Sequence, residues 1–226
     1  MTHEHLIEIR DLGKTYTSGK NLVTAIDHMD FSIDDKEFVT IMGQSGSGKS
    51  TLLACMGALN RPSRGKIFVD SLDLYTLSNE QRADFRSEYM GFIFQSFQLI
   101  PYLTVLENIK LPMAVTGRTK REKNRMAMEV IDRVGLKEKA DRLPDQLSGG
   151  EQERVAIARA IVNKPPIILA DEPTGNLDSE TAKEIMGLLK SLNQDGHTII
   201  MVTHNAEMET FASRTIRVRD GKSYTG

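Results

Sequence analysis

The stretch "GQSGSGKST", from Gly43 to Thr51, constrains the fold of this chain more than any other segment. It follows the apolar run "FVTIM" and precedes the apolar run "LLACMGAL", an order typical of a buried strand, a loop and a helix. Glycines let the backbone turn its N–H groups inward, and the positive end of the following helix adds to their attraction for anions. The segment therefore predicts a phosphate-binding loop. The residues expected to line it are Gly43, Ser45, Gly46, Ser47, Gly48, Lys49, Ser50 and Thr51.

Four side chains in and beyond this loop predict its chemistry. Lys49 is expected to neutralise β- and γ-phosphate oxygens, and the Ser50 hydroxyl is expected to bind Mg²⁺. The run "IILADEP" ends a predicted buried strand in Asp171, which supplies a carboxylate for the same ion. Glu172 follows directly and is placed to accept a proton from attacking water, which predicts a hydrolase rather than a kinase. The alternative for this acidic pair is a solvated turn before Pro173.

A histidine, His204, ends the apolar run "TIIMVTH". A single histidine at a strand end is often structural. Parallel strands, however, deliver their carboxyl ends to one edge of the sheet. We therefore expect His204 to lie near Lys49 and Asp171, where it could contact the γ-phosphate.

The hydrophobic pattern predicts an α/β fold. The runs "LIEIRDL", "AIDHMDFSI" and "KIFVD" make the first third β-rich, whereas "IILAD" and "TIIMVTH" lack alternation, as strands buried on both faces of a parallel sheet do. The tail "TIRVRDGKSYT" predicts a hairpin that turns at Asp220 and Gly221. We expect one domain over residues 1–226. Its parts are a nucleotide-binding core, an antiparallel β portion near the N-terminus and an inserted helical part at about residues 96–160.

The middle of the chain predicts helices. Three helix starts have the Ser/Thr-x-x-Glu/Gln pattern of a capping box, namely Ser78 with Gln81, Thr104 with Glu107, and Thr119 with Glu122. The third helix carries Met126, Val130 and Val134 on one face and should end near Gly135. A helix after "IILAD" should bury Ala182, Ile185, Leu189 and Leu192.

Composition excludes several classes of protein. The 226 residues are 39% hydrophobic and 27% charged, which is ordinary globular material, and the net charge of −2 argues against a general attraction for nucleic acid. The single cysteine, Cys55, cannot form an internal disulfide and is expected to be a packed thiol. The N-terminus lacks the pattern of a signal peptide, and no apolar run approaches the ~20 residues that span a bilayer. We therefore expect a cytosolic chain.

The stretch "LSGGEQERVAIARA" contains a second helix start that could bind an anion. Ser148 and Glu151 form a capping box, but glycine costs a helix roughly 1 kcal/mol relative to alanine, so Gly149 and Gly150 indicate that something approaches the backbone closely. "LSGGE" resembles the signature motif of ATP-binding cassette (ABC) ATPases. In that family the signature of one subunit caps the γ-phosphate of ATP held by the phosphate loop of another. The resemblance therefore implies a homodimer that shares two ATP molecules.

The resemblance covers nearly the whole chain and implies further roles. Tyr16, in "GKTYTSG", is similar to the aromatic residue that stacks on adenine, although it could also be a strand-edge tyrosine. Gln95, in "GFIFQSFQL", resembles the glutamine that contacts Mg²⁺ and the attacking water, so the implied metal ligands are Ser50, Gln95 and Asp171. Asp178, in "GNLDS", resembles the aspartate of the dimer-contact loop. Glu172 matches the general base of the family, and His204 matches its switch histidine.

Two acids depart from the family pattern. Glu151 stands where glutamine is commonest, and Glu153 is another unusual acid close by. Both are expected to add negative charge near a site that meets phosphate. The backbone N–H donors and Ser148 remain unchanged.

Two long stretches, "FRSEYMGFIFQSFQLIPYLTVLENIKLPM" and "ILADEPTGNLDSETAKEIM", look most like the ATPases of lipoprotein-release, macrolide-export and cell-division transporters. The resemblance implies an ATPase bound to an integral membrane permease at the cytoplasmic face of the cell membrane. The apolar segment after Gln95 would then either meet that permease or fold back on the chain. One alternative is a soluble ABC ATPase that acts on nucleic acid or ribosomes, although such relatives usually carry tandem cassettes or a coiled-coil insertion. A small-molecule kinase is the other.

Overall fold

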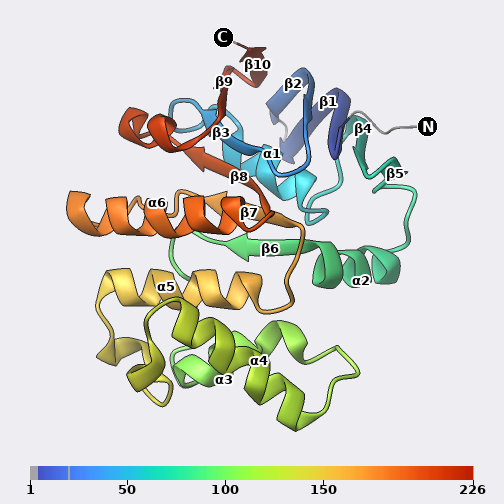
Figure 1. The fold of residues 1–226 in the computed structure, drawn as a ribbon. Helices are drawn as coiled ribbons and strands as arrows, with labels where there is room; N and C mark the ends of the chain where they lie inside the picture. The colour runs from blue at the N-terminus through green and yellow to red at the C-terminus, as the bar shows by residue number, and fades with distance from the viewer. Residues whose placement is uncertain (1–4, 20, 226) are drawn as a thin grey trace.

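The structure is a computed structural model that describes residues 5–19 and 21–225. It contains a four-stranded sheet in the order β2-β1-β4-β5 and a six-stranded sheet in the order β10-β9-β3-β8-β7-β6 (Figure 1). The first sheet is built from β1 (Ile7–Ser18), β2 (Asn21–Ile33), β4 (Arg64–Val69) and β5 (Leu72–Asp73). The second is built from β3 (Phe38–Met42), β6 (Met90–Ile93), β7 (Ile167–Asp171), β8 (Thr198–Thr203), β9 (Arg214–Arg219) and β10 (Lys222–Thr225).

The six-stranded sheet is parallel except at β10, and its register brings the predicted site segments to one edge. Met42 pairs with Thr203, Asp171 with Val202, and Ile93 with Ala170. The segments after β3, β6, β7 and β8 therefore leave the sheet side by side. All of β3 and β8 is buried, as the unbroken apolar runs predicted.

Helices cover both faces of this sheet. On one face α1 (Lys49–Met56) packs between the two sheets, and on the other lie α5 (Gly149–Ile161) and α6 (Ser179–Gln194) (Figure 1). Alternate residues of β8 confirm the two faces, because Ile200 and Val202 pack with α1 whereas Ile199 and Met201 pack with α5 and α6. The phosphate loop and the "LSGGE" helix thus begin on opposite faces of one sheet.

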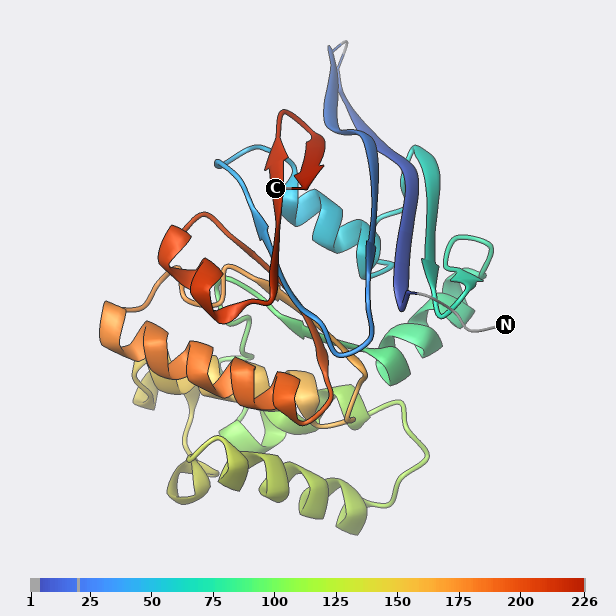
Figure 2. The same cartoon turned by 45° about the horizontal axis from the view of Figure 1, so that its top comes forward.

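A third apolar cluster joins α3 (Val105–Lys110) and α4 (Lys120–Arg133) to α5. Figure 2 shows these helices and the four-stranded sheet at opposite ends of the molecule. The remaining helices are α2 (Asn79–Tyr89) and the short 3₁₀ helices η1 (Leu111–Met113), η2 (Lys137–Lys139), η3 (Pro144–Gln146) and η4 (Ala206–Phe211).

The local signals in the sequence are confirmed. Ser78, Thr104 and Thr119 cap α2, α3 and α4 in complete capping boxes. The tail is a hairpin whose turn residues, Asp220 and Gly221, both have positive φ. Cys55 is fully buried, and burial raises the pKa of its thiol to about 11, so it is a packed thiol.

The buried stripe of α4 is shifted from the prediction. Ala127 and Ile131 are fully buried together with Val134, whereas Met126 and Val130 are only partly buried. The helix packs against both α3 and α5, so the contacted stripe is wider than a single row of residues at i and i+4. The predicted stripe of α6, in contrast, is buried as expected.

Candidate functional site

The phosphate loop, residues 43–48, is enclosed by backbone from two other strands. A Cβ atom on Gly43 would lie 2.2 Å from the carbonyl oxygen of Val218, and one on Gly48 would lie 2.1 Å from that of Ala25. Gly46 and Gly48 have φ of +79° and +101°. Position 48 needs glycine for two reasons: the positive φ would strain any other residue, and its Cβ would clash with the Ala25 carbonyl.

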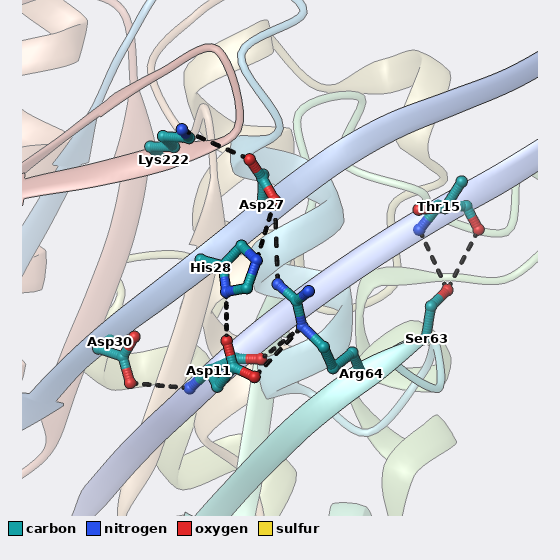
Figure 3. A network of polar contacts seen from close by, with 8 residues as sticks. All are labelled: Asp11, Thr15, Asp27, His28, Asp30, Ser63, Arg64 and Lys222. Carbon is teal, nitrogen blue, oxygen red and sulfur yellow. Dashed lines mark hydrogen bonds and ion pairs between the residues drawn. The ribbon is translucent and has the colours of Figure 1, made fainter.

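A polar network ties the hairpin β9–β10 to β2 and β4 (Figure 3). The Gly221 N–H donates to the Ser47 carbonyl over 3.3 Å, and the Asp27 N–H of β2 donates to the Gly221 carbonyl over 2.7 Å. The Asp27 carboxylate lies 3.5 Å from Lys222 Nζ and 3.9 Å from Arg64 Nη2, so it links β2 with β10 and β4. The network therefore braces the loop from outside.

Inside the loop, the groups are arranged to accept an anion. Lys49 is buried, and its Nζ donates to the carbonyl oxygens of Gly43 and Gln44 over 2.7 and 2.9 Å. The hydroxyl of Ser47 is buried and has no hydrogen-bond partner within residues 5–19 and 21–225. Ser45 is exposed, and Thr51 is half-buried in the first turn of α1. The Lys49 ammonium and the Ser47 hydroxyl are donors that could hold phosphate oxygens, and the dipole of α1 would add to their attraction.

Ser50 and Asp171 form a pair of oxygen ligands. The Ser50 hydroxyl donates to Asp171 Oδ1 over 3.1 Å. Burial is the main cause that raises the pKa of the Asp171 carboxyl; the hydrogen bond from Ser50 opposes it. No group of three or more His, Cys, Asp or Glu residues in the described chain could hold a metal by itself. A hydroxyl and a carboxylate are oxygen ligands of the kind that Mg²⁺ takes together with phosphates and water, so the pair fits this ion.

Glu172 is held in a conformation that few non-glycine residues adopt. Its φ is +49°, and its N–H donates to the Val202 carbonyl over 3.0 Å. One carboxylate oxygen lies 2.8 Å from Nδ1 of His204, and the other accepts from the Thr203 hydroxyl over 3.4 Å. The Glu172 side chain is 11% exposed and that of His204 is 62% exposed. The predicted base and histidine are thus in contact, and the backbone of the predicted base is strained.

Gln95 leaves the sheet beside this loop. Its carbonyl oxygen accepts a hydrogen bond from Asn176 Nδ2 over 2.8 Å, and a Cβ atom on Gly175 would lie 3.6 Å from Gln95 Nε2. Gln95 is exposed. Asn176 could not be identified from the sequence, because one amide next to a motif carries no signal until the two loops are seen together.

Tyr16 lies on the hairpin that borders the phosphate loop. It pairs with Val23 of β2, two residues before Ala25, which contacts Gly48. Tyr16 is 39% exposed, and Lys14 Nζ lies 5.0 Å from the centroid of its ring. An exposed aromatic face at this place can stack on a base.

The two glycines at the helix start "LSGGE" have different neighbours. Ser148 caps α5 in a capping box with Glu151. A Cβ atom on Gly150 would lie 2.4 Å from Thr181 Cγ2, whereas one on Gly149 would lie 3.4 Å from Leu177. Gly150 is therefore required by packing on α6. Gly149 is not required by packing in the same way, so its backbone is the part of the first turn that a ligand could approach.

The two unusual acids, Glu151 and Glu153, lie in different environments. Lys139 binds the Glu151 carboxylate, and this contact is the main cause that lowers the pKa of Glu151. The expectation that Glu153 places charge near phosphate is wrong, because its side chain is fully buried. Position 153 falls on the face of α5 that is turned inward.

Asp178 is the N-cap of α6. Its carboxylate accepts hydrogen bonds from the N–H groups of Glu180 and Thr181 and from the Thr181 hydroxyl over 2.7 Å. These contacts, led by those of Thr181, lower the pKa of its carboxyl. The cap fixes the start of the helix that also packs against Gly150.

The chain matches the family model described as "ABC transporter" over residues 26–175. It is 44% identical to the macrolide export ATP-binding/permease protein MacB of Vibrio parahaemolyticus over 96% of this chain but only 33% of that protein. It is 44% identical to the uncharacterized ABC transporter ATP-binding protein MJ0796 of Methanocaldococcus jannaschii over 96% of this chain and 94% of that one. The structure described as dimeric MJ0796 superimposes with a TM-score of 0.89 at 43% identity and covers 96% of both chains. A dimeric structure of that cassette in a post-hydrolysis state, bound to ADP and Pi, also gives 0.89, at 42% identity.

Within residues 5–19 and 21–225, no helix combines the length and apolarity needed to cross a bilayer.

Proposed function

The chain belongs to the ABC transporter family of ATP-hydrolysing subunits, and we propose that two copies of it form two shared ATP sites that drive a membrane permease. One observation carries this proposal. The phosphate loop leads into α1 on one face of the central sheet, while the Ser148 helix start belongs to α5 on the other. The phosphate loop and the Ser148 helix start of one chain therefore cannot both contact the same phosphate. Two facing copies can, and MJ0796 is described as dimeric.

The roles within each site follow from the contacts. Ser50, Asp171 and Gln95 would hold Mg²⁺, which when bound neutralises phosphate charge. Glu172 accepts the proton of the attacking water, and His204 holds the Glu172 carboxylate in place over 2.8 Å. Tyr16 stacks on adenine. Ser148 and Gly149 of the second copy close the site by donating hydrogen bonds to the γ-phosphate.

The experiment that tests the shared sites mixes two inactive variants. Lys49→Ala removes phosphate neutralisation, and Gly149→Asp places a carboxylate against phosphate. Each mixed dimer would keep one intact site, so we expect roughly half the wild-type rate per mixed dimer, because one of its two sites works. Heterodimers shown to form by affinity-tag capture, yet with no recovered hydrolysis, would contradict sharing between copies.

We further propose a separate permease as partner at the cytoplasmic face of the membrane. This chain corresponds to 33% of MacB, whose name includes a permease. In the segment after Gln95, Leu99 packs on the third cluster while Tyr102 is 77% exposed. An exposed aromatic side chain joined to the Gln95 loop can pass movement from the ATP site to a bound helix. The macrolide-export or lipoprotein-release mode of action is part of this proposal. The family and the relatives give no support to the nucleic-acid or ribosome alternative.

A further inference from the structure

Arg159, in the last turn of α5, binds the loop that follows Gln95. Its guanidinium donates to the carbonyl oxygen of Phe97 over 2.7 Å and to that of Gln98 over 2.5 Å. Both loop residues have positive φ, of +57° and +48°. A strained pair of residues persists only where surrounding contacts hold it, and these two hydrogen bonds are such contacts.

Glu153 lies on the same helix and is fully buried. Neither of its carboxylate oxygens has a hydrogen-bond partner in the described part of the chain. Burial raises the pKa of Glu153 to about 8, and Arg159 opposes this increase. An ionised carboxylate without a partner in such a place is costly, so ionisation must recruit a donor or disturb the packing.

Arg159 lies six positions further along α5, and its positive charge opposes the rise in the pKa of Glu153. Strand β6 and helix η1, which pack on α5, contain no ionisable side chain. Other charged groups near α5 have partners: Lys139 binds Glu151, Arg154 binds Glu184 of α6, and Lys110 of α3 donates to Asn124. The remaining charged side chains on α3, α4 and α6 are Glu107, Lys120, Arg121, Glu122, Lys123, Arg125, Glu129, Asp132, Arg133, Glu180, Lys183 and Lys190.

We propose that Arg159 is a positioning residue for Gln95 and that ionised Glu153 competes with the loop for it. When Glu153 is protonated, Arg159 holds the carbonyls of Phe97 and Gln98 and so fixes the loop. When Glu153 loses its proton to solvent, its charge draws the guanidinium away and the loop loses both bonds. The inference rests on the proposed role of Gln95 in the ATP site. Arg159 also links that loop to α5, the helix that Ser148 caps.

The first test compares ATP hydrolysis by wild type and Glu153→Gln across about pH 6.5 to about pH 9.5. A carboxyl with a pKa of about 8 goes from about one-tenth ionised at about pH 7 to about nine-tenths at about pH 9. The kcat ratio of wild type to variant should therefore fall at least about threefold over that interval. The KM for ATP should be unchanged, because the phosphate loop is untouched. A kcat ratio that stays constant overturns the proposal.

Glu151→Gln is the matched control, since Glu151 lies on the same helix but Lys139 and Ser148 hold its pKa low. Its pH profile should have the shape of the wild-type profile. Arg159→Lys keeps the charge but cannot hold two carbonyls in the same geometry, so kcat should fall at unchanged KM. In that background Glu153→Gln should no longer change the pH profile. If it changes the profile as much as in wild type, Glu153 does not act through Arg159.

A second measurement needs no hydrolysis. Hydrogen exchange of amides 96–100 at about pH 9 should be faster in wild type than in Glu153→Gln, because the freed loop opens more often. Equal exchange overturns the competition. If wild type and Glu172→Gln hydrolyse ATP equally, the proposed site itself fails. If that variant is inactive and exchange is equal, only the present inference fails.

Discussion

At the scale of single residues, the carboxylate of Glu172 is held from both sides. His204 and Thr203 each contact one oxygen, and the backbone at Glu172 has a φ of +49°. Such a conformation costs about 1–3 kcal/mol for a residue other than glycine. The surrounding strands impose it, since the Glu172 N–H bonds to β8. The position of the proposed base is therefore fixed before substrate binds.

Glu172→Gln tests that role. The amide has the same shape and still contacts His204, but it cannot take a proton, so hydrolysis should fall by about 10²-fold or more. ATP binding should persist, and ATP with Mg²⁺ should trap a dimer on a sizing column. A variant that hydrolyses ATP at a near-normal rate would exclude Glu172 as the base.

Glu153 predicts an unusual dependence of stability on pH. Its folded-state pKa, about 8, lies above its ordinary value of 4.5, so the folded state holds the proton more tightly. The contribution is fully present below the ordinary pKa and is lost as pH rises toward 8. Relative to Glu153→Gln, the wild-type free energy of unfolding should fall by roughly 1 kcal/mol per pH unit between about pH 5 and about pH 8. Urea unfolding at several pH values measures it, and parallel curves for the two proteins would contradict it.

At the scale of elements, helix starts are placed by packing as much as by caps. The first turn of α5 touches α6 so closely that position 150 has no room for a methyl group. Thr181 cannot simply rotate away, because its hydroxyl is bound to Asp178. The cap of one helix therefore sets the space available to the other.

Gly149→Ala and Gly150→Ala separate packing from ligand access. Gly150→Ala should destabilise the chain by about 1–3 kcal/mol, because Thr181 must move. Gly149→Ala should be neutral or slightly stabilising, since alanine favours a helix by about 1 kcal/mol, yet it should lower hydrolysis. Thr181→Ser removes the clashing methyl group and keeps the hydroxyl, so it should restore the stability of Gly150→Ala. Chemical unfolding measures the free energy of unfolding of wild type, Gly149→Ala, Gly150→Ala and the double variant Gly150→Ala/Thr181→Ser. Equal losses of stability in the two glycine variants would contradict these separate roles.

At the scale of the whole molecule, the two ends pack against different segments of the chain. The four-stranded sheet and the hairpin β9–β10 brace the phosphate loop, whereas α3 and α4 form a separate cluster at the opposite end (Figure 2). The loop from Gln95 to α3 joins them. Movement at the proposed ATP site would therefore have a covalent path to the surface around Tyr102.

Tyr102→Glu and Leu103→Glu test that surface. Hydrolysis by the isolated subunit should stay within about twofold of wild type, because a surface change away from the ATP site is nearly neutral. Co-purification with the permease should be lost, since a buried charge at an interface is costly. Leu72→Glu, at a position 40% exposed in β5 of the four-stranded sheet, is the matched control. Normal permease capture and transport by both docking variants would place the contact elsewhere.

The sequence by itself determined the local structure and the identity of the chemical groups. The capping boxes at Ser78, Thr104 and Thr119, the hairpin at Asp220 and the unbroken apolar strands all depend on neighbours within a few residues. The phosphate loop could be predicted because its strand, glycines, lysine and helix are contiguous. Roles for Tyr16, Gln95 and Asp178 came from the family resemblance.

Only the tertiary structure decided which groups face each other. Glu153 looked like a surface acid near phosphate, but the packing of α5 turned it inward, and the capture of Glu151 by Lys139 joins separate helices. The need for glycine at position 150 depends on Thr181, and the hold of Arg159 on the Gln95 loop spans 62 positions of sequence. Such contacts carry no signal in one sequence, because side chains that meet across a core are set by the packing of whole elements rather than by local pattern.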